Sequence, residues 1–294
     1  MSRRVLVAIM SSLLLVCFGS PAQAVDLGQE LKNAIERNTQ PQAEPSSPQS
    51  GGGIDVGGVR GLLGFSVEEE VAIGRQAAGT LLGAAPLVKD AKLQKYVNNV
   101  GRWVASQSER PDLDWHFGVI DSSDINAFAA PGGYVFVTKG LYRLLQSESE
   151  LAGVLAHEVG HVIEKHHLKV LQQSQLLDLG SRLLSQTAGE HQIIKNLIGN
   201  GAEIFARSLD RTAEYEADRI AVVLAARAGY DAFGLPTVLQ DIGHAGEDSP
   251  GVKLLFKTHP HPDDRLAHLD DAVGDRFDTL KGQTLERRFY RIKP

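Results

Sequence analysis

The stretch LAGVLAHEVGHVIEKHH, residues 151–167, places four histidines and two glutamates in an otherwise apolar run. Apolar residues recur at helical spacing in this region, and Ser147 with Glu150 forms the pattern that caps a helix N-terminus. We therefore expect a helix in which His157 and His161 lie one turn apart on the same face. Two imidazoles placed in this way can bind one metal ion.

Glu158 directly follows the first of these histidines, which completes the H-E-x-x-H arrangement of zinc peptidases. In that position a carboxylate can reach a water molecule held by the metal instead of the metal itself. The alternative interpretation is an ordinary buried helix with a pair of hydrogen-bonded core histidines. It is less favoured, because an unpaired buried glutamate would be costly.

A catalytic zinc ion needs a third protein ligand and an open position for water. His167 occupies the place of the third histidine in metzincins, but that motif needs a glycine where this chain has Glu164. In an unbroken helix His167 would lie about 15 Å along the axis from His157, too far to share an ion. The metzincin interpretation therefore fails, and we expect His166 and His167 to form an exposed helix end.

A better source of the third ligand is SLDRTAEYEADRIAVVLAARAG, residues 208–229, which has the pattern of a second helix. Glu214 and Asp218 are four residues apart there and share a face. One carboxylate could bind zinc while the other orients a histidine ligand. The pair could equally form a solvated acidic face with Arg211 and Arg219, and spacing alone leaves both interpretations open.

The remaining pattern predicts an α+β fold that is mainly helical, with a small antiparallel sheet beside the active-site helix. Helices are expected from Ser66 to about Leu82, with a capping box at the start, and over residues 88–106. The stretch DWHFGVIDS, residues 114–122, predicts a strand. Residues 125–140 predict two strands joined by a turn at Pro131-Gly132-Gly133.

The N-terminal residues 1–24 resemble a cleaved secretory signal peptide, with two arginines, an apolar core and a small-residue cleavage site. A membrane anchor is the less favoured alternative, because the apolar core is short for a membrane span. Residues 25–60 predict a short helix and a flexible linker rich in Pro, Ser and Gly. We therefore expect a catalytic domain over residues 61–294 and a location in the periplasm.

The formal net charge of −6 argues against a basic surface for nucleic acid. Residues 176–206 join the two expected metal-binding helices and contain four glycines. This segment fits either a mobile lid over the zinc cleft or a packed helical hairpin.

Four motifs together resemble the HtpX and type-I CAAX prenyl-protease family of zinc metallopeptidases, in particular its soluble periplasmic branch. They are NAFAAPGG (126–133), HEVGH (157–161), RTAEYEAD (211–218) and THPHPDDR (258–265). The resemblance implies one zinc ion per chain in a gluzincin-type site, with ligands His157, His161 and Glu214. It makes Glu158 the catalytic carboxylate and Asp218 a residue that supports a ligand.

The resemblance also implies a zinc-dependent endopeptidase that hydrolyses misfolded or unassembled cell-envelope proteins. We expect its partners to be such substrates, with peripheral contact to the membrane or to the outer-membrane assembly machinery. An extended substrate could add to the edge of the strand Asn126–Ala130 through backbone hydrogen bonds. The competing class is a zinc-binding chaperone-like or structural periplasmic protein without proteolytic turnover. From the short stretch after residue 265 we expect no helical-repeat domain of the kind that some periplasmic relatives carry.

Two prolines in THPHPDDR predict an extended loop. If the loop folds back over the cleft, Arg265 could stabilise the oxyanion of the reaction as a second catalytic residue. His259 could be a fourth zinc ligand in the resting state and so restrain the enzyme. The alternative is a surface loop whose histidine caps a neighbouring helix.

Overall fold

The computed structural model describes residues 64–174, 209–244 and 251–292. The expected signal peptide, the linker and the segment 176–206 lie outside these ranges. None of the helices within the ranges is both long and apolar enough to cross a membrane.

Two helices begin the described chain, and side chains fix where each one starts. In α3 (Val67–Ala84) the Ser66 hydroxyl accepts a hydrogen bond from the Glu69 amide, and the Glu69 carboxylate accepts one from the Ser66 amide. This confirms the predicted capping box. In α4 (Ala91–Ala105) Asp90 accepts hydrogen bonds from two backbone amides of the first turn, so the helix begins three residues later than predicted.

A three-stranded sheet follows, with the strands in the order β1-β3-β2. β2 (Ala127–Ala130) and β3 (Tyr134–Thr138) are antiparallel and joined by η1 (Pro131–Gly133), as the strand–turn–strand pattern predicts. β1 (His116–Ile120), however, pairs with β3 in parallel. The prediction of a purely antiparallel sheet is therefore wrong, because β3 inserts between β1 and β2 and runs in the direction of β1.

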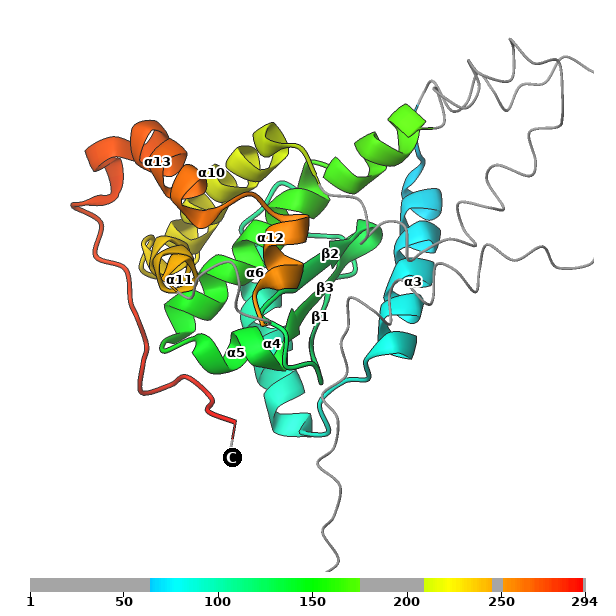
Figure 1. Ribbon diagram of the computed structural model, residues 1–294, viewed down its shortest axis with the longest axis horizontal. Helices are drawn as coiled ribbons and strands as arrows, with labels where there is room; N and C mark the ends of the chain where they lie inside the picture. Colours follow the sequence, from blue (N-terminus) through cyan, green and yellow to red (C-terminus); the bar gives the residue numbers. More distant parts are fainter. Residues whose placement is uncertain (1–63, 175–208, 245–250, 293–294) are drawn as a thin grey trace, which may run out of the picture.

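The sheet separates two apolar layers (Figure 1). One face packs against α3 through Ile120, Phe128 and Phe136. The other face packs, through residues such as Ala127 and Ala129, against α4 and the central helix α6 (Glu148–Ile163), which follows the short α5 (Lys139–Leu144). This arrangement confirms the predicted α+β fold with a small sheet beside the helix that carries H-E-x-x-H.

The remaining helices follow α6 in the chain, and the first two of them pack directly against it. They are α10 (Arg211–Arg227), α11 (Gly234–Gly243), α12 (Lys253–Thr258) and α13 (Pro262–Val273), followed by η2 (Gly274–Phe277). α10 lies directly against α6, where a Cβ on Gly160 would be 3.2 Å from Cα of Ala217. A glycine at this point lets the two helices approach closely, which brings side chains of α6 and α10 to one place.

The helix that carries H-E-x-x-H is shorter than the sequence predicts. α6 ends at Ile163, and Lys165 adopts a left-handed backbone conformation with φ 55° before residues 166–174 resume a helical path. The prediction of one unbroken helix past residue 170 is therefore wrong. A break without glycine or proline is uncommon, and it changes where the last two histidines of the motif region lie.

The N-terminus of α6 is held by a buried carboxylate. Glu148 accepts hydrogen bonds from Tyr96 (2.7 Å), Tyr230 (2.8 Å) and the Arg288 guanidinium (2.8 Å from Nε). Arg288 lies in the C-terminal segment, whose Phe289 is buried in the core. The first turn of α6 is thus tied to α4, to the residues after α10 and to the end of the described chain.

Candidate metal centre

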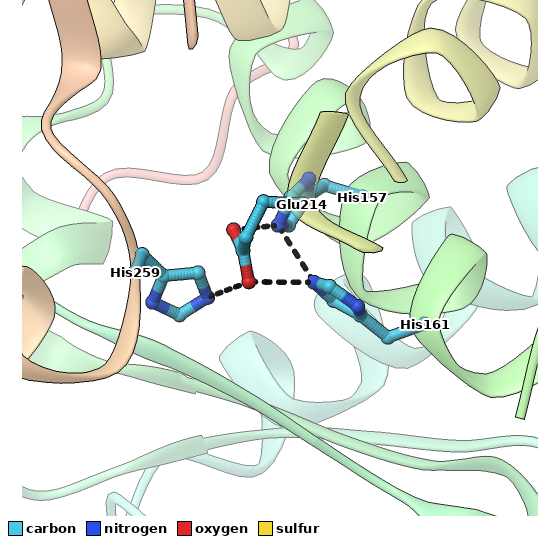
Figure 2. Close-up of side chains that lie close together, drawn as sticks. All are labelled: His157, His161, Glu214 and His259. Atoms are coloured by element: carbon cyan, nitrogen blue, oxygen red, sulfur yellow. Dashed lines mark hydrogen bonds and ion pairs between the residues drawn. The ribbon is translucent and has the colours of Figure 1, made fainter. Parts of the chain in front are cut away.

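Four side chains from three parts of the chain converge in one buried cluster (Figure 2). α6 provides His157 and His161, α10 provides Glu214, and His259 lies at the end of α12. One ligand atom from each residue lies within 4.8 Å of the others.

The short distances within the cluster all join ligand atoms. The two Nε2 atoms of His157 and His161 are 3.0 Å apart. Glu214 places Oε2 3.6 Å from Nε2 of His157 and Oε1 3.5 Å from Nε2 of His161. The Nε2 atom of His259 lies 3.9 Å from Oε1 of Glu214.

The cluster fits a metal ion on the evidence of its own polar atoms. Within the described part of the chain, both carboxylate oxygens of Glu214 are buried and have no hydrogen-bond partner. A buried carboxylate without hydrogen bonds is costly unless a cation compensates it. Imidazole nitrogen and carboxylate oxygen are the ligands that zinc binds in catalytic sites, so this set of donors suits zinc.

The carboxylates are not a solvated acidic face. Glu214 is fully buried and Asp218 is 1% exposed, and Arg211, which that alternative paired with them, instead lies 3.3 Å from Asp264. The acidic-face interpretation of residues 208–229 is therefore wrong. The helix itself is confirmed, with Asp210 as its N-cap and Gly229 just after its end.

Asp218 lies behind the cluster and contacts the first histidine. Its Oδ1 is 2.9 Å from Nδ1 of His157, and Arg265 donates to the same carboxylate from Nε (2.9 Å) and Nη2 (2.6 Å). Burial alone would raise the pKa of Asp218, but the Arg265 charge holds it well below its usual range. Asp218 is therefore ionised next to His157.

The two histidines of α6 differ in their charge environment. Burial and the Arg265 charge lower the pKa of His157, but the carboxylates of Asp218 and Glu214 outweigh them and raise it to about 9. For His161, burial and then the charge on His157 lower the pKa well below its ordinary value. His161 is therefore neutral, as a metal ligand must be, whereas His157 must release a proton when it binds metal.

Glu158 is buried next to the cluster. Burial is the main reason that its pKa rises to about 7, and the Glu214 carboxylate adds to the effect, while His157 and Arg265 oppose it. A carboxyl group with a pKa near neutrality can both accept and release a proton at physiological pH.

The segment THPHPDDR differs from its prediction. His259 and His261 are extended, as expected before proline, but α13 begins at Pro262 and includes Arg265. The prediction of an extended loop is wrong from residue 262 onward, because proline favours the first position of a helix. His261 caps α13 by accepting a hydrogen bond from the Asp263 amide, whereas His259 reaches the cluster.

The prediction of an exposed histidine pair after α6 is also wrong. His166 is 4% exposed, and His167 is partly buried. The ring nitrogen Nδ1 of His166 lies 2.9 Å from Nδ1 of His161, and its Nε2 lies 3.2 Å from Oε2 of Glu216. Sequence spacing did not indicate this contact, because it depends on the break at Lys165.

The model of peptidase family M48 matches residues 91–273, which include every residue of this cluster. The chain belongs to peptidase family M48. The resemblance carried by the four motifs is thereby confirmed at the level of the family, whose members are zinc metallopeptidases.

The chain is also similar to curated proteases from bacteria and mitochondria. The chain is 32% identical to the beta-barrel assembly-enhancing protease of Yersinia pestis over 72% of this chain and 45% of that protein. Identity to the Escherichia coli protease of the same name is 33% over 69% of this chain and 43% of the relative. The mitochondrial metalloendopeptidase OMA1 of Arabidopsis thaliana is 30% identical over 59% of this chain and 35% of that protein. The chain thus spans less than half the length of these relatives.

Proposed function

We propose that this protein is a zinc metalloendopeptidase of the M48 family that hydrolyses misfolded or unassembled cell-envelope proteins. The observation that carries the proposal is the buried carboxylate of Glu214, whose two oxygens lack hydrogen-bond partners within the described residues and face three imidazole nitrogens. The peptidase domain spans residues 61–294, since the segment around Phe289 packs into the same core as α6.

His157, His161 and Glu214 would hold the zinc ion. When bound, zinc lowers the pKa of a coordinated water and polarises the carbonyl group of the scissile bond. Glu158, which is buried next to this cluster, would take the proton of the attacking water and deliver it to the leaving amine.

Arg265 and Asp218 complete the polar part of the site. The Nη1 atom of Arg265 lies 3.9 Å from Oε2 of Glu214, so one edge of the guanidinium faces the cluster while the other holds Asp218. From this position Arg265 stabilises the negative charge that develops on the carbonyl oxygen. Asp218 orients His157 through Nδ1.

β2 is the strand to which an extended substrate adds. No strand pairs with its second edge in the part of the chain that the structure describes. At its start the side-chain amide of Asn126 is fully buried, and neither polar atom of that amide has a partner there. A peptide that adds to this edge has to displace the groups that cover the amide, which then offers a donor and an acceptor to a peptide group.

In the resting enzyme His259 would be a fourth ligand of the metal and would restrain the activity. Its ring nitrogen faces Glu214 inside the cluster, and its other nitrogen lies 2.9 Å from the Thr258 hydroxyl, which fixes the ring. A peptide substrate has to displace His259 to gain access to the metal. Such a contact keeps the peptidase inactive until a substrate enters.

The substrate class and the location follow from the sequence and the relatives together. Residues 1–24 resemble an export signal, and the bacterial relatives are named for enhancing β-barrel assembly. A peptide that binds along a strand edge is held mainly by backbone hydrogen bonds, which depend little on its side chains. This mode of binding suits unfolded substrates of varied sequence. The protein therefore acts in the periplasm, in contact with unassembled envelope proteins and with their assembly machinery at the outer membrane.

The direct test is proteolysis by the purified full chain. Zinc-loaded protein should cleave casein or a denatured envelope protein, and both a chelator and the substitution Glu158→Gln should abolish cleavage. Because Glu158→Gln keeps the metal ligands, it should retain zinc and trap substrates in cells, where proteomics of the envelope fraction can identify them. Zinc binding without cleavage by the wild type would instead support the chaperone-like alternative.

A further inference from the structure

The second metal-binding histidine has a support that differs from that of the first. His157 contacts the Asp218 carboxylate directly, whereas the outer nitrogen of His161 contacts another imidazole, that of His166, at 2.9 Å. The far nitrogen of His166 in turn lies 3.2 Å from the Glu216 carboxylate. A chain of three side chains therefore leads from the metal cluster to a carboxylate at the surface.

The positions of the protons along this chain are determined by the ligand at its inner end. Metal binding through Nε2 of His161 requires that this nitrogen carries no proton, so the proton of the neutral ring is on Nδ1. Nδ1 of His161 then donates to Nδ1 of His166, which must be unprotonated and act as the acceptor. The proton of His166 is then on Nε2, where it is donated to Glu216. Every donor in the chain has one acceptor.

The backbone is bent in a way that makes this contact. His166 follows Lys165, whose φ of 55° ends α6 and turns the chain, so that His166 lies beside the last turn of α6. A left-handed conformation is unfavourable for a lysine, and the Nζ atom of Lys165 is anchored 3.2 Å from the buried carboxylate of Glu70. Without the turn, His166 would continue along the helix axis and away from His161.

We propose that His166 is a positioning residue for the metal site, which holds His161 in the tautomer and ring orientation that bind the metal, with Glu216 orienting His166. This inference rests on the proposed zinc site and adds His166 and Glu216 as residues that increase its affinity for the metal. Groups that hydrogen-bond to the outer nitrogen of a histidine ligand typically change metal affinity by about 10–100-fold. His166 does not contact the ion or the substrate.

The test compares two replacements of His166 in the full chain. His166→Phe keeps an aromatic ring but removes the acceptor, whereas His166→Asn places an amide oxygen near the position of Nδ1. Zinc affinity is measured by competition with a chelator, the tautomer of His161 by ¹⁵N NMR of the imidazoles, and folding by the Tm of the metal-free protein. Glu164→Gln is the matched control, because Glu164 is an outward carboxylate near the same turn that pairs with Lys169.

We expect His166→Phe to weaken zinc binding by about 10–100-fold and to remove the preference of His161 for a proton on Nδ1. His166→Asn should recover most of both, and Glu164→Gln should leave both unchanged. If His166→Phe does not fold, Glu216→Leu provides a second test, because Glu216 is 40% exposed and its replacement should not prevent folding. Glu216→Leu should weaken zinc binding more than Glu164→Gln does.

Two results would overturn the inference. One is wild-type zinc affinity in His166→Phe while the wild type binds and cleaves normally, which would leave the proposed function intact. The other is an equal loss of affinity in His166→Phe and His166→Asn that follows their loss of Tm, which would make His166 a packing residue only. Absence of zinc binding by the wild type would remove the proposed function together with the inference.

Discussion

The Nδ1 atom of His157 lies 2.9 Å from Oδ1 of Asp218, and Arg265 holds the same carboxylate through two nitrogens. His157 lies in α6 and Asp218 lies in α10. Their contact therefore fixes one imidazole of the cluster relative to the helix that carries Glu214. A carboxylate in this place sets the ring orientation of a histidine and increases its basicity toward a metal.

Asp218→Asn should therefore weaken zinc binding by about 10–100-fold without removing it. The amide oxygen can still accept a hydrogen bond from His157, but the negative charge is lost. Competition with a chelator measures the change. The control is Asp264→Asn, which removes an exposed carboxylate that pairs with Arg211 and should leave zinc affinity unchanged. Equal affinity of the two variants would contradict the assigned role of Asp218.

Elemental analysis of purified variants tests the ligand set. The wild type should contain about one zinc per chain, and His157→Ala, His161→Ala and Glu214→Ala should each lose it, because a catalytic site has three protein ligands. Glu214 is the decisive position, since its carboxylate has no hydrogen bond of its own within the described residues. Full metal content in Glu214→Ala would show that the third ligand lies elsewhere.

His259→Ala should retain zinc and cleave an unfolded substrate faster than the wild type. The reason is that His259 contacts the cluster from the connection between α12 and α13 and, in the proposed resting state, would compete with the substrate for the metal. Initial rates on casein at equal zinc content measure the effect. His261→Ala is the matched control, because His261 caps α13 and is not a member of the cluster. Should His259→Ala cleave no faster than the wild type, the restraining role has to be abandoned.

Local patterns predicted most of the elements that build the site. The capping residues of α3 and α6, the turn at Pro131 and the apolar period of α6 are all signals that a few neighbouring residues carry. The pairing of β1 with β3 was not predictable in this way, because strand order depends on how distant segments pack and not on the residues of the strands.

The turn at Lys165, within the site, was likewise not predictable from the neighbouring residues. Nothing in the residues after His161 marks a helix end, and Lys165, which forms the turn, is held by Glu70, 95 positions earlier in the chain. The burial of His166 and its contact with Glu216 follow from that turn. Local spacing indicated His157 and His161 as candidate ligands, and the family resemblance added Glu214, but neither signal indicated that His166 and Glu216 support them.

Glu70 should make folding stability depend on acidic pH. Burial raises its pKa, but hydrogen bonds and charge from Arg110, with Lys165 and the Gly132 amide, outweigh this and lower it below the ordinary value of 4.5. A group with a lowered folded-state pKa contributes stability above its unfolded pKa, and this contribution is lost as the pH falls through the folded-state value. Glu70→Gln should therefore cost about 2 kcal/mol at neutral pH.

The Tm of Glu70→Gln relative to the wild type measures this contribution across pH. The difference should be largest above pH 4.5 and should shrink as the pH falls below that value. Glu109→Gln removes an exposed carboxylate that pairs with Arg227 and should show no comparable difference at any pH. A Tm difference for Glu70→Gln that stays constant down to acid pH would mean that the charge of Glu70 contributes nothing.

Substitution of Asn126 tests whether its side chain contributes to substrate binding or to the stability of the fold. Its backbone groups bond to Thr138, but its side-chain amide has no partner within the described residues, so removing the amide breaks no hydrogen bond among those residues. Asn126→Ala should therefore leave the Tm unchanged or slightly higher, while kcat/KM for an unfolded substrate falls about tenfold through the loss of a hydrogen bond to the peptide. Thr138→Val is the contrasting control, because the Thr138 hydroxyl bonds to the backbone of Asp124 and Asn126 and its loss should lower the Tm. A lower Tm with unchanged kcat/KM in Asn126→Ala would assign the amide to the fold and remove it from the substrate-binding edge.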